Sequence, residues 1–236
     1  MASTLEIPKR PARKFLSEDF KLTTWEALKP FFDDLIAREI STSSQLKKWL
    51  HDRSELESVL SEDMGWRYIR MTCFTENEEY RKAYQDFVEN IQPQIAPVSD
   101  QLNKKAMACS FLSELEREQG YDMMVRNLKK DIELFREENV PLYTEISTET
   151  QKYAQISGAM TVELIGQELT LQQAAVVLQD TDRAKREEVY RKINARRLQD
   201  KVVLDDLYTK LINLRHKVST NAGFSNFRPL SLSKSL

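Results

Sequence analysis

The sequence predicts an all-α fold, made mainly of long antiparallel helices, with one small β-hairpin near residues 160–169. Glycine is scarce, at 5 in 236 residues, and all-β folds need more turn residues than that. Apolar residues recur at helical spacing through most of the chain. Capping boxes, in which a Thr and a Glu or Gln three residues later satisfy each other's backbone amides, predict helix starts at Thr23, Thr42, Thr75 and Thr170.

The N-terminal region, residues 1–22, is predicted to be an extended arm because it is rich in Pro, Lys and Ser. Its apolar side chains Phe15, Leu16, Phe20 and Leu22 could dock it onto a helical body.

Two helices are expected next, from about Trp25 to Glu39 and from about Ser44 to Thr72. The second carries a clear apolar stripe at helical spacing, which is expected to continue through Trp66 and Ile69. The stripe consists of Leu46, Trp49, Leu50, Leu56, Val59 and Leu60.

A third helix has the most regular pattern in the chain. Its apolar positions are Tyr80, Tyr84, Phe87, Ile91, Ile95, Val98 and Leu102. Pro93 and Pro97 interrupt this stripe, and a proline in a helix interior costs roughly 3 kcal/mol because it removes a donor and crowds the carbonyl four residues earlier. Since the apolar pattern continues through both prolines, the sequence predicts one bent helix.

Further helices are predicted over residues 121–135 and 142–157. After Gly158 the apolar period changes from that of a helix to alternation, which predicts the hairpin, turning at Ile165-Gly166. A short helix is expected at 171–179.

The last predicted helix is the longest and runs from about Arg183 to Thr220. Leu204, Leu207, Leu211, Leu214 and Val218 form a heptad stripe that is expected to pack inside the helical body, because it is shorter than a usual coiled-coil seam. Gly223 stands where a C-cap glycine is typical. Residues 229–236 are expected to be frayed.

Composition excludes several classes of function. The net charge is -2 with 31% charged residues, so nothing draws the whole chain to nucleic acid or to a membrane surface. No apolar run is long enough to span a bilayer, and residues 1–13 lack the apolar stretch of a secretory signal. The basic run 183–201 is interpreted as a salt-bridged solvent face. Cys73 and Cys109 suit buried free thiols, which predicts a cytoplasmic location.

No residue of this chain is assigned a catalytic, cofactor-binding or metal-binding role. A zinc peptidase helix needs two His one turn apart and a Glu beside the first. The only histidines are His51 and His216, and neither is followed by Glu. Both are expected to be at least partly exposed on helices.

The segment Asn221-Ala222-Gly223-Phe224-Ser225-Asn226-Phe227-Arg228 resembles a segment of the oligoendopeptidase F family of zinc metallopeptidases. Other stretches are similar as well: 49–56, 63–72, 135–139, 169–174 and 182–190. The resemblance covers most of the chain from about residue 14 to Arg228.

The resemblance implies that residues 23–228 form the helical N-terminal half of such an enzyme, one wall of a deep channel. In that family a catalytic half follows, with a His-Glu-x-x-His helix that binds zinc and hydrolyses short peptides. None of those residues can be carried onto this sequence, where residues 229–236 leave the family pattern. The expectation is a truncated, inactive portion whose exposed apolar faces favour self-association. The alternative is a stand-alone helical protein-interaction module.

Overall fold

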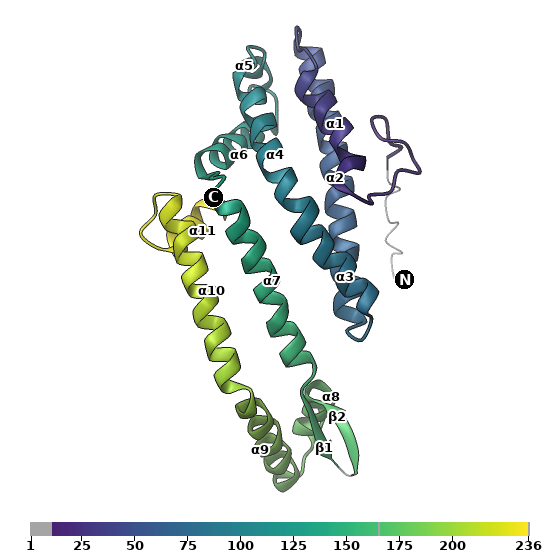
Figure 1. The fold of residues 1–236 in the computed structure, drawn as a ribbon, viewed down its shortest axis with the longest axis vertical. Helices are drawn as coiled ribbons and strands as arrows, with labels where there is room; N and C mark the ends of the chain where they lie inside the picture. The colour runs from purple at the N-terminus through teal and green to yellow at the C-terminus, as the bar shows by residue number, and fades with distance from the viewer. Residues whose placement is uncertain (1–10, 165, 236) are drawn as a thin grey trace, which may run out of the picture. The chain divides into compact units, whose positions relative to one another are not determined.

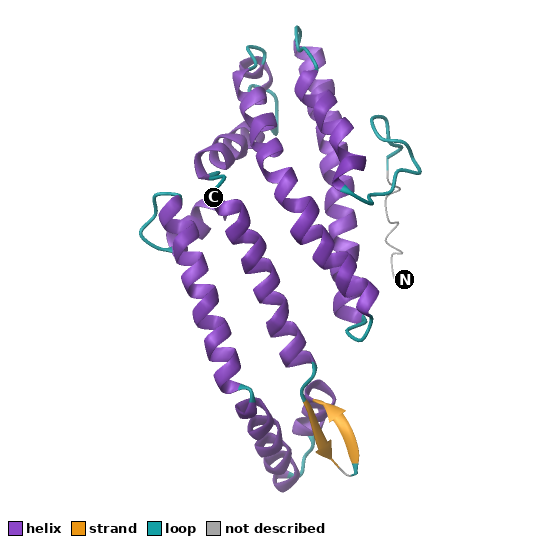
Figure 2. Cartoon of the chain, viewed as in Figure 1, coloured by secondary structure: helices purple, strands orange, loops and turns teal. Residues whose placement is uncertain are grey.

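The structure, a computed structural model, describes residues 11–164 and 166–235 and is dominated by helices (Figure 2). The chain divides into two compact units. Among the described residues, the first unit contains 11–67 and 97–132, and the second unit contains 68–96 and 133–235. The all-α prediction with one hairpin is confirmed.

The elements follow one another along the chain as drawn in Figure 1. They are α1 Trp25–Ala37, α2 Ser43–Cys73, α3 Glu78–Asp86, a π-helical turn Phe87–Ile91, α4 Gln92–Ala108, α5 Leu112–Leu115, α6 Tyr121–Leu134, α7 Asn139–Gly158, β1 Thr161–Leu164, β2 Gln167–Thr170, α8 Leu171–Val176, a 3-10 turn Val177–Gln179, α9 Arg183–Gln199, α10 Lys201–Asn221 and α11 Phe227–Ser235.

In the first unit, α1 and α2 join through a buried apolar core and one specific hydrogen bond. Leu28 and Leu35 of α1 and Leu46 of α2 are fully buried. The indole Nε1 of Trp49 donates to the Leu35 carbonyl at 2.8 Å. This bond also satisfies one of the carbonyls that the end of α1 leaves without an intrahelical partner.

The described part of the N-terminal arm docks onto the same unit, as predicted. Leu16 and Leu22 are buried. The backbone amides of Lys14, Phe15 and Leu16 all donate to the carboxylate of Glu55, at 2.8, 3.0 and 2.8 Å. One carboxylate on α2 therefore fixes three successive residues of the arm. The first ten residues of the arm lie outside the described residues.

Residues 78–108 form one uninterrupted helical run through α3, the π turn and α4, which confirms that the two prolines do not separate unrelated helices. The irregularity falls at Phe87–Ile91 and ends two residues before Pro93. A π turn widens the helix, which gives the Pro93 ring room beside the carbonyl four residues earlier.

The second unit is built on the antiparallel pair α7 and α10, which lie side by side in Figure 1. Asn139 at the start of α7 is 2% exposed, and its Nδ2 donates to the carbonyl of Val218 near the end of α10 at 3.0 Å. Asn221 Nδ2 donates to Asn139 Oδ1 at 2.7 Å. Leu211, Leu214 and Val218 are buried, whereas Leu204 and Leu207 are only half-buried, so the heptad stripe packs inside the unit in its C-terminal part.

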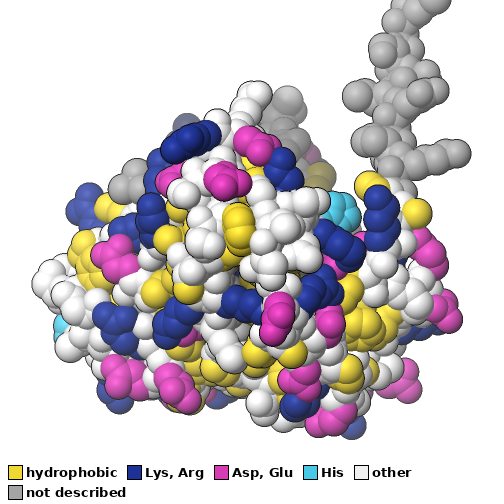
Figure 3. Space-filling model, turned by 90° about the horizontal axis from the view of Figure 1, so that it is seen from above, with side chains coloured by type: hydrophobic (Ala, Val, Ile, Leu, Met, Phe, Trp, Pro, Cys, Tyr) yellow, Lys and Arg dark blue, Asp and Glu magenta, His cyan; other side chains and the backbone are white. Residues whose placement is uncertain are grey.

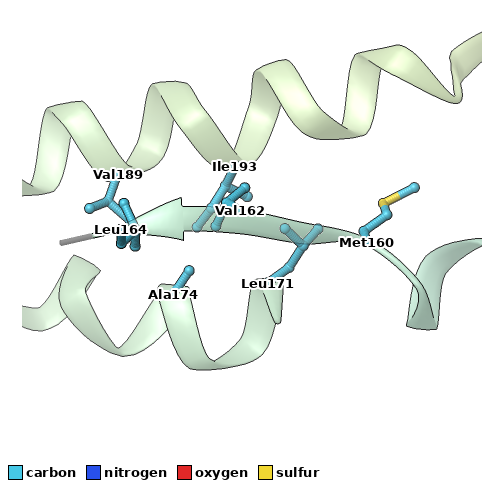
Figure 4. Packing of buried hydrophobic residues seen from close by; sticks show 7 residues of the cluster. All are labelled: Met160, Val162, Leu164, Leu171, Ala174, Val189 and Ile193. Atoms are coloured by element: carbon cyan, nitrogen blue, oxygen red, sulfur yellow. The ribbon is translucent and has the colours of Figure 1, made fainter. Parts of the chain in front are cut away.

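The predicted hairpin is confirmed and packs between two helices (Figure 4), although Ile165 of its predicted turn lies outside the described residues. β1 and β2 are antiparallel, with Val162 opposite Leu169. The apolar side chains of the hairpin meet α8 and α9 in one buried cluster, which supplies the packing that a lone two-stranded hairpin needs. The cluster consists of Met160, Val162, Leu164, Leu171, Ala174, Val189 and Ile193.

The predicted capping boxes have mixed outcomes. At Thr170 both reciprocal hydrogen bonds with Gln173 are present. At Thr42 the hydroxyl accepts from the Gln45 amide at 3.2 Å, but the Gln45 side chain accepts from Ser41. The boxes at Thr23 and Thr75 are wrong. Helix α1 has Thr24 at its N-cap, and α3 starts after Asn77, whose side chain accepts from two backbone amides.

Two other predictions are corrected at the C-terminal end. The expected single helix over 183–220 is broken at Asp200, where φ is -96° and ψ is 9°. Helix α9 packs on the hairpin and α8, whereas α10 packs on α7, so the two helices have different packing partners. The expected frayed end is instead α11, with Leu230 buried at 1% exposure. Asn226 caps it by accepting from the Arg228 amide at 3.1 Å, and Pro229 falls in the first turn, where proline is tolerated.

The C-cap at Gly223 is confirmed as a Schellman motif. Gly223 has φ of 85°, its amide donates to the Thr220 carbonyl, and the Phe224 amide donates to the Ser219 carbonyl, both at 2.9 Å. These are the two hydrogen bonds that define the motif at the end of a helix.

Replacing Gly223 with Ala should lower the free energy of unfolding by roughly 1–2 kcal/mol, because an L-residue in the left-handed region brings Cβ too close to the carbonyl. Urea unfolding followed by circular dichroism measures the change. Gly65→Ala is the matched control, since a Cβ at Gly65 in α2 meets nothing within 4 Å. Alanine there should be neutral or stabilising by up to about 1 kcal/mol. Equal loss of stability in both variants would contradict the capping role.

Replacing Glu55 with Gln should release the arm. Burial alone would raise the pKa of Glu55, but the three backbone amides outweigh it and hold the pKa below its ordinary value. A lowered folded pKa means that the stabilisation is present above the unfolded pKa and is lost as pH falls through the folded pKa. Hydrogen bonds to a charged group contribute about 1.5–3 kcal/mol each, so exchange of the Lys14–Leu16 amides should rise at least about tenfold in the variant.

Hydrogen exchange read by mass spectrometry tests this, at neutral pH for the variant and along a descending pH series for the unmodified chain. Glu57→Gln is the control, because Glu57 pairs with Arg53 and not with the arm. Unchanged protection of the arm in Glu55→Gln would refute the role of the carboxylate.

Candidate functional site

The two histidines are far apart in the sequence and belong to different units. His51 is exposed on α2 in the first unit, and His216 is exposed on α10 in the second, as expected. No group of three or more His, Cys, Asp or Glu among residues 11–164 and 166–235 could hold a metal ion. The described residues therefore do not fit the zinc site that the resemblance implies for an intact enzyme.

The cysteines differ from the prediction of buried thiols. Cys73, the last residue of α2, is exposed, and Cys109 is only half-buried. The apolar stripe of α2 does not stay buried to its end, since Trp66 is 51% and Ile69 is 45% exposed. Periodicity alone predicts the longer stripe, and it does not indicate whether a neighbouring segment covers the last two turns.

Cys109 has a basic neighbour that the sequence pattern could have revealed, because Lys105 stands four residues earlier. The Lys105 ammonium donates to the carbonyls of Leu35, Ile36 and Arg38 at 3.0, 2.7 and 2.5 Å. Burial and the nearby Arg38 guanidinium lower the pKa of Lys105. Because its donors are used to cap α1, Lys105 has a structural role.

The basic run of α9 is largely paired, as predicted. Arg191 pairs with Glu187 at 2.7 Å, and Arg196 pairs with Asp200 at 2.5 Å. Lys192 pairs with Glu188 at 2.9 Å. On the face seen from above in Figure 3, Lys and Arg side chains are likewise interspersed with Asp and Glu. No helix in the described part of the chain is long and apolar enough to span a membrane.

Helix α7 carries a buried ionic cluster on the side that meets α10. Glu149 is 6% exposed and lies 2.8 Å from the Nζ atoms of both Lys152 and Lys210. Hydrogen bonds from Lys152 and Lys210 hold the pKa of Glu149 below its ordinary value, against the opposing effect of burial. Lys210 also pairs with Glu145 at 2.9 Å. The two bonds of Lys210 join α10 to α7, whereas the bond of Lys152 lies within α7.

A different side of α7 borders a hollow of about 280 Å³, named the α7 hollow, entirely within the second unit. Its wall on α7 is made of Gln151, Ala154, Gln155 and Gly158, which recur at steps of three and four and so lie on one helix face. The opposite wall is formed by the end of α2, the turn after it and the start of α3. That wall contains Met71, Thr72, Thr75, Glu76 and Arg81.

One residue that borders the α7 hollow, Gln151, has a polar atom without a hydrogen-bond partner among the described residues. The Nε2 atom of Gln151 is buried and makes no hydrogen bond there. Arg81, on the opposite wall, bonds to the exposed Glu78 through Nε and Nη2, and to Gln85 Oε1 at 3.5 Å. The hollow could not be predicted from the sequence, because its two walls are about eighty positions apart and no motif connects them.

Residues 15–135 match the family described as the peptidase M3 N-terminal domain. No curated protein matches the chain. Solved structures share the fold closely. An oligoendopeptidase F structure from crystals grown by microfluidic seeding has a TM-score of 0.84 and 20% identity, over 94% of this chain and 40% of that one.

Two further solved structures have a similarly high TM-score to this chain. PZ peptidase A with an inhibitor gives a TM-score of 0.84 at 20% identity, covering 94% of this chain and 39% of its own. An oligoendopeptidase F from Bacillus anthracis gives 0.83 at 22% identity, covering 92% of this chain and 40% of its own. The chain thus spans about 40% of the length of the solved structures it matches. With the matched family region covering half of its length, the chain belongs to the M3 peptidase family, as its N-terminal domain.

Proposed function

We propose that this chain is the N-terminal, channel-wall portion of a zinc-dependent oligoendopeptidase and does not hydrolyse peptides by itself. The observation that carries the proposal is the extent of the fold match to an oligoendopeptidase F. The match includes 94% of this chain but only 40% of that structure. The sequence supports it, since it contains two histidines and no His-Glu-x-x-His motif.

Hydrolysis then depends on a second polypeptide region that brings the zinc ligands and the general base. Three protein ligands and an open position for water are what a catalytic zinc site requires. The two exposed histidines here are on different units and have no acidic or thiol cluster around them among the described residues. The proposed contribution of this chain is to shape and restrict the space that short peptides enter.

Exposed apolar side chains near the junction of α9 and α10 are the proposed contact surface for that second region. Leu198 is 66%, Val202 is 69% and Val203 is 54% exposed. Single exposed apolar residues are ordinary, but a contiguous group marks an interaction site or an association liability. In the absence of the second region, the same group would favour self-association of this chain.

An activity assay tests the proposal. The purified chain, supplied with zinc, should show no chelator-sensitive cleavage of a fluorogenic short peptide. Cleavage should appear on mixing with a separately expressed C-terminal half that carries His-Glu-x-x-His, taken from the same genome. Chelator-sensitive cleavage by the chain alone, or failure of the two halves to associate, would overturn it.

A variant pair tests the contact surface in the same mixture. Val202→Thr changes the surface with little change in shape and should weaken association of the two halves several-fold. Val176→Thr, at a side chain of nearly equal exposure on α8 (67%), should leave association unchanged. Sedimentation velocity reads both the mixed complex and any self-association of the chain. If the two variants associate equally well with the C-terminal half, the contact surface does not include Val202.

A further inference from the structure

We propose that α10 pairs with the α10 of a second copy of this chain, antiparallel and across a two-fold axis. The contact is a stripe on the surface of α10, named the α10 stripe, which consists of Asp205, Tyr208, Ile212 and Arg215. The proposal concerns the chain by itself and does not rest on the proposed function. It assigns the contact between copies to residues other than those of the α9–α10 junction.

The four residues of the α10 stripe share one face of the helix. Their steps of three, four and three positions keep them on one side of an α-helix. Each directly follows a member of the heptad stripe (204, 207, 211 and 214), so it lies about 100° around the helix from the side that packs on α7. Tyr208 is 62% and Ile212 is 48% exposed. The centre of the stripe therefore leaves largely apolar surface in contact with solvent.

The order of residues in the stripe is self-complementary. The spacing is the same when read from either end, with its centre at position 210. A copy that runs in the opposite direction places Tyr208 against Ile212 and Asp205 against Arg215. Each of these contacts then occurs twice across the two-fold axis, as in any isologous interface. Parallel copies in register would instead place like charges against each other, so the charges select the antiparallel arrangement.

The two charges of the stripe are not accounted for by their own helix. An acid near the start and a base near the end would complement the helix macrodipole, but that effect is confined to the first and last turns. Helix α10 runs from Lys201 to Asn221, so Asp205 and Arg215 lie inside those turns. Asp205 pairs with Lys201 at 2.7 Å on an exposed surface, and such a pair contributes little and is readily exchanged for another.

Arg215 is held in place for a second contact. Its guanidinium carbon lies 5.8 Å from the centroid of the Phe227 ring of α11. A side chain that is already ordered loses less conformational freedom when it binds, which lowers the entropic cost of pairing with an acid of another copy.

The length of the stripe sets the strength of the dimer. From Asp205 to Arg215 the helix rises about 15 Å, so the buried area belongs with transient interfaces, below about 1,200 Å² in total. The dimer is therefore expected to be weak and reversible, with a dissociation constant in the micromolar range. Because both charged contacts lie at the edge of solvent, added salt should weaken it.

Two charge-reversal variants, studied alone and mixed, test the proposal by sedimentation velocity over a series of micromolar concentrations. Asp205→Arg and Arg215→Asp each place like charges together at both contacts, so each variant alone should dimerise at least about tenfold more weakly than the unmodified chain. In an equimolar mixture, one copy of each variant meets opposite charges at both contacts. A heterodimer with an affinity close to that of the unmodified dimer is expected, and its formation also shows that both variants are folded.

Asp206→Arg is the matched control for charge. It makes the same change at an exposed residue one position along, about 100° around the helix from Asp205, and should leave association unchanged. Ile212→Ser tests the centre of the stripe without changing charge and should weaken the dimer at least about tenfold, because the apolar contact is lost twice. Val176→Ser, on the exposed surface of α8, is its control and should have no effect.

Three results would overturn the proposal. The first is an unmodified chain that stays monomeric throughout the concentration series. The second is a dimer that is unaffected by Asp205→Arg and Ile212→Ser. The third is self-association that is lost in Val202→Thr but kept in Asp205→Arg, which would place the contact between copies at the α9–α10 junction. None of these results bears on the proposed function, because the catalytic half is absent from the samples.

Discussion

The fixed position of α7 against α10 is the constraint on which the second unit depends. Two polar attachments hold it: the Asn139 side chain donates to the carbonyl of Val218, and the Glu149 carboxylate pairs with Lys210 of α10. A buried carboxylate is tolerated only while its partners stay in place, since leaving one unpaired inside a protein is strongly destabilising. The attachments on α7 are at Asn139 and Glu149, and the α7 hollow borders the helix beyond them, at residues 151–158.

The helical architecture was predictable because it follows from local rules. The stripe from Leu46 to Leu60 is buried as its spacing requires, and the change of period after Gly158 correctly locates the hairpin. Gly223 takes the positive φ that its place after a helix predicts. Each of these signals depends on residues within a few positions of one another, and that is the range over which sequence patterns determine conformation.

The wrong predictions occur where two nearby residues could each cap the same helix, or where contacts between distant segments determine burial and helix ends. Asn77 caps α3 in place of Thr75, and its side-chain oxygen accepts from the backbone amides of Glu79 and Tyr80. The break at Asp200 reflects two different packing partners, which the heptad spacing does not encode. The exposure of Cys73, the burial of Leu230 and the walls of the α7 hollow all depend on which distant segments meet. Nothing in the residues around Gln151 indicates that its Nε2 atom would find no hydrogen-bond partner among the described residues.

The π-helical turn Phe87–Ile91 carries one residue more than α-helical geometry requires over the same rise. Such a turn is structurally equivalent to a single-residue insertion that the helix has absorbed without breaking. Related chains that are one residue shorter between Asp86 and Gln92 can therefore run straight α-helix through this point. A structural alignment of such chains should place its gap in this turn. If the gap is placed in a nearby loop instead, every position between the turn and that loop is aligned with the wrong residue.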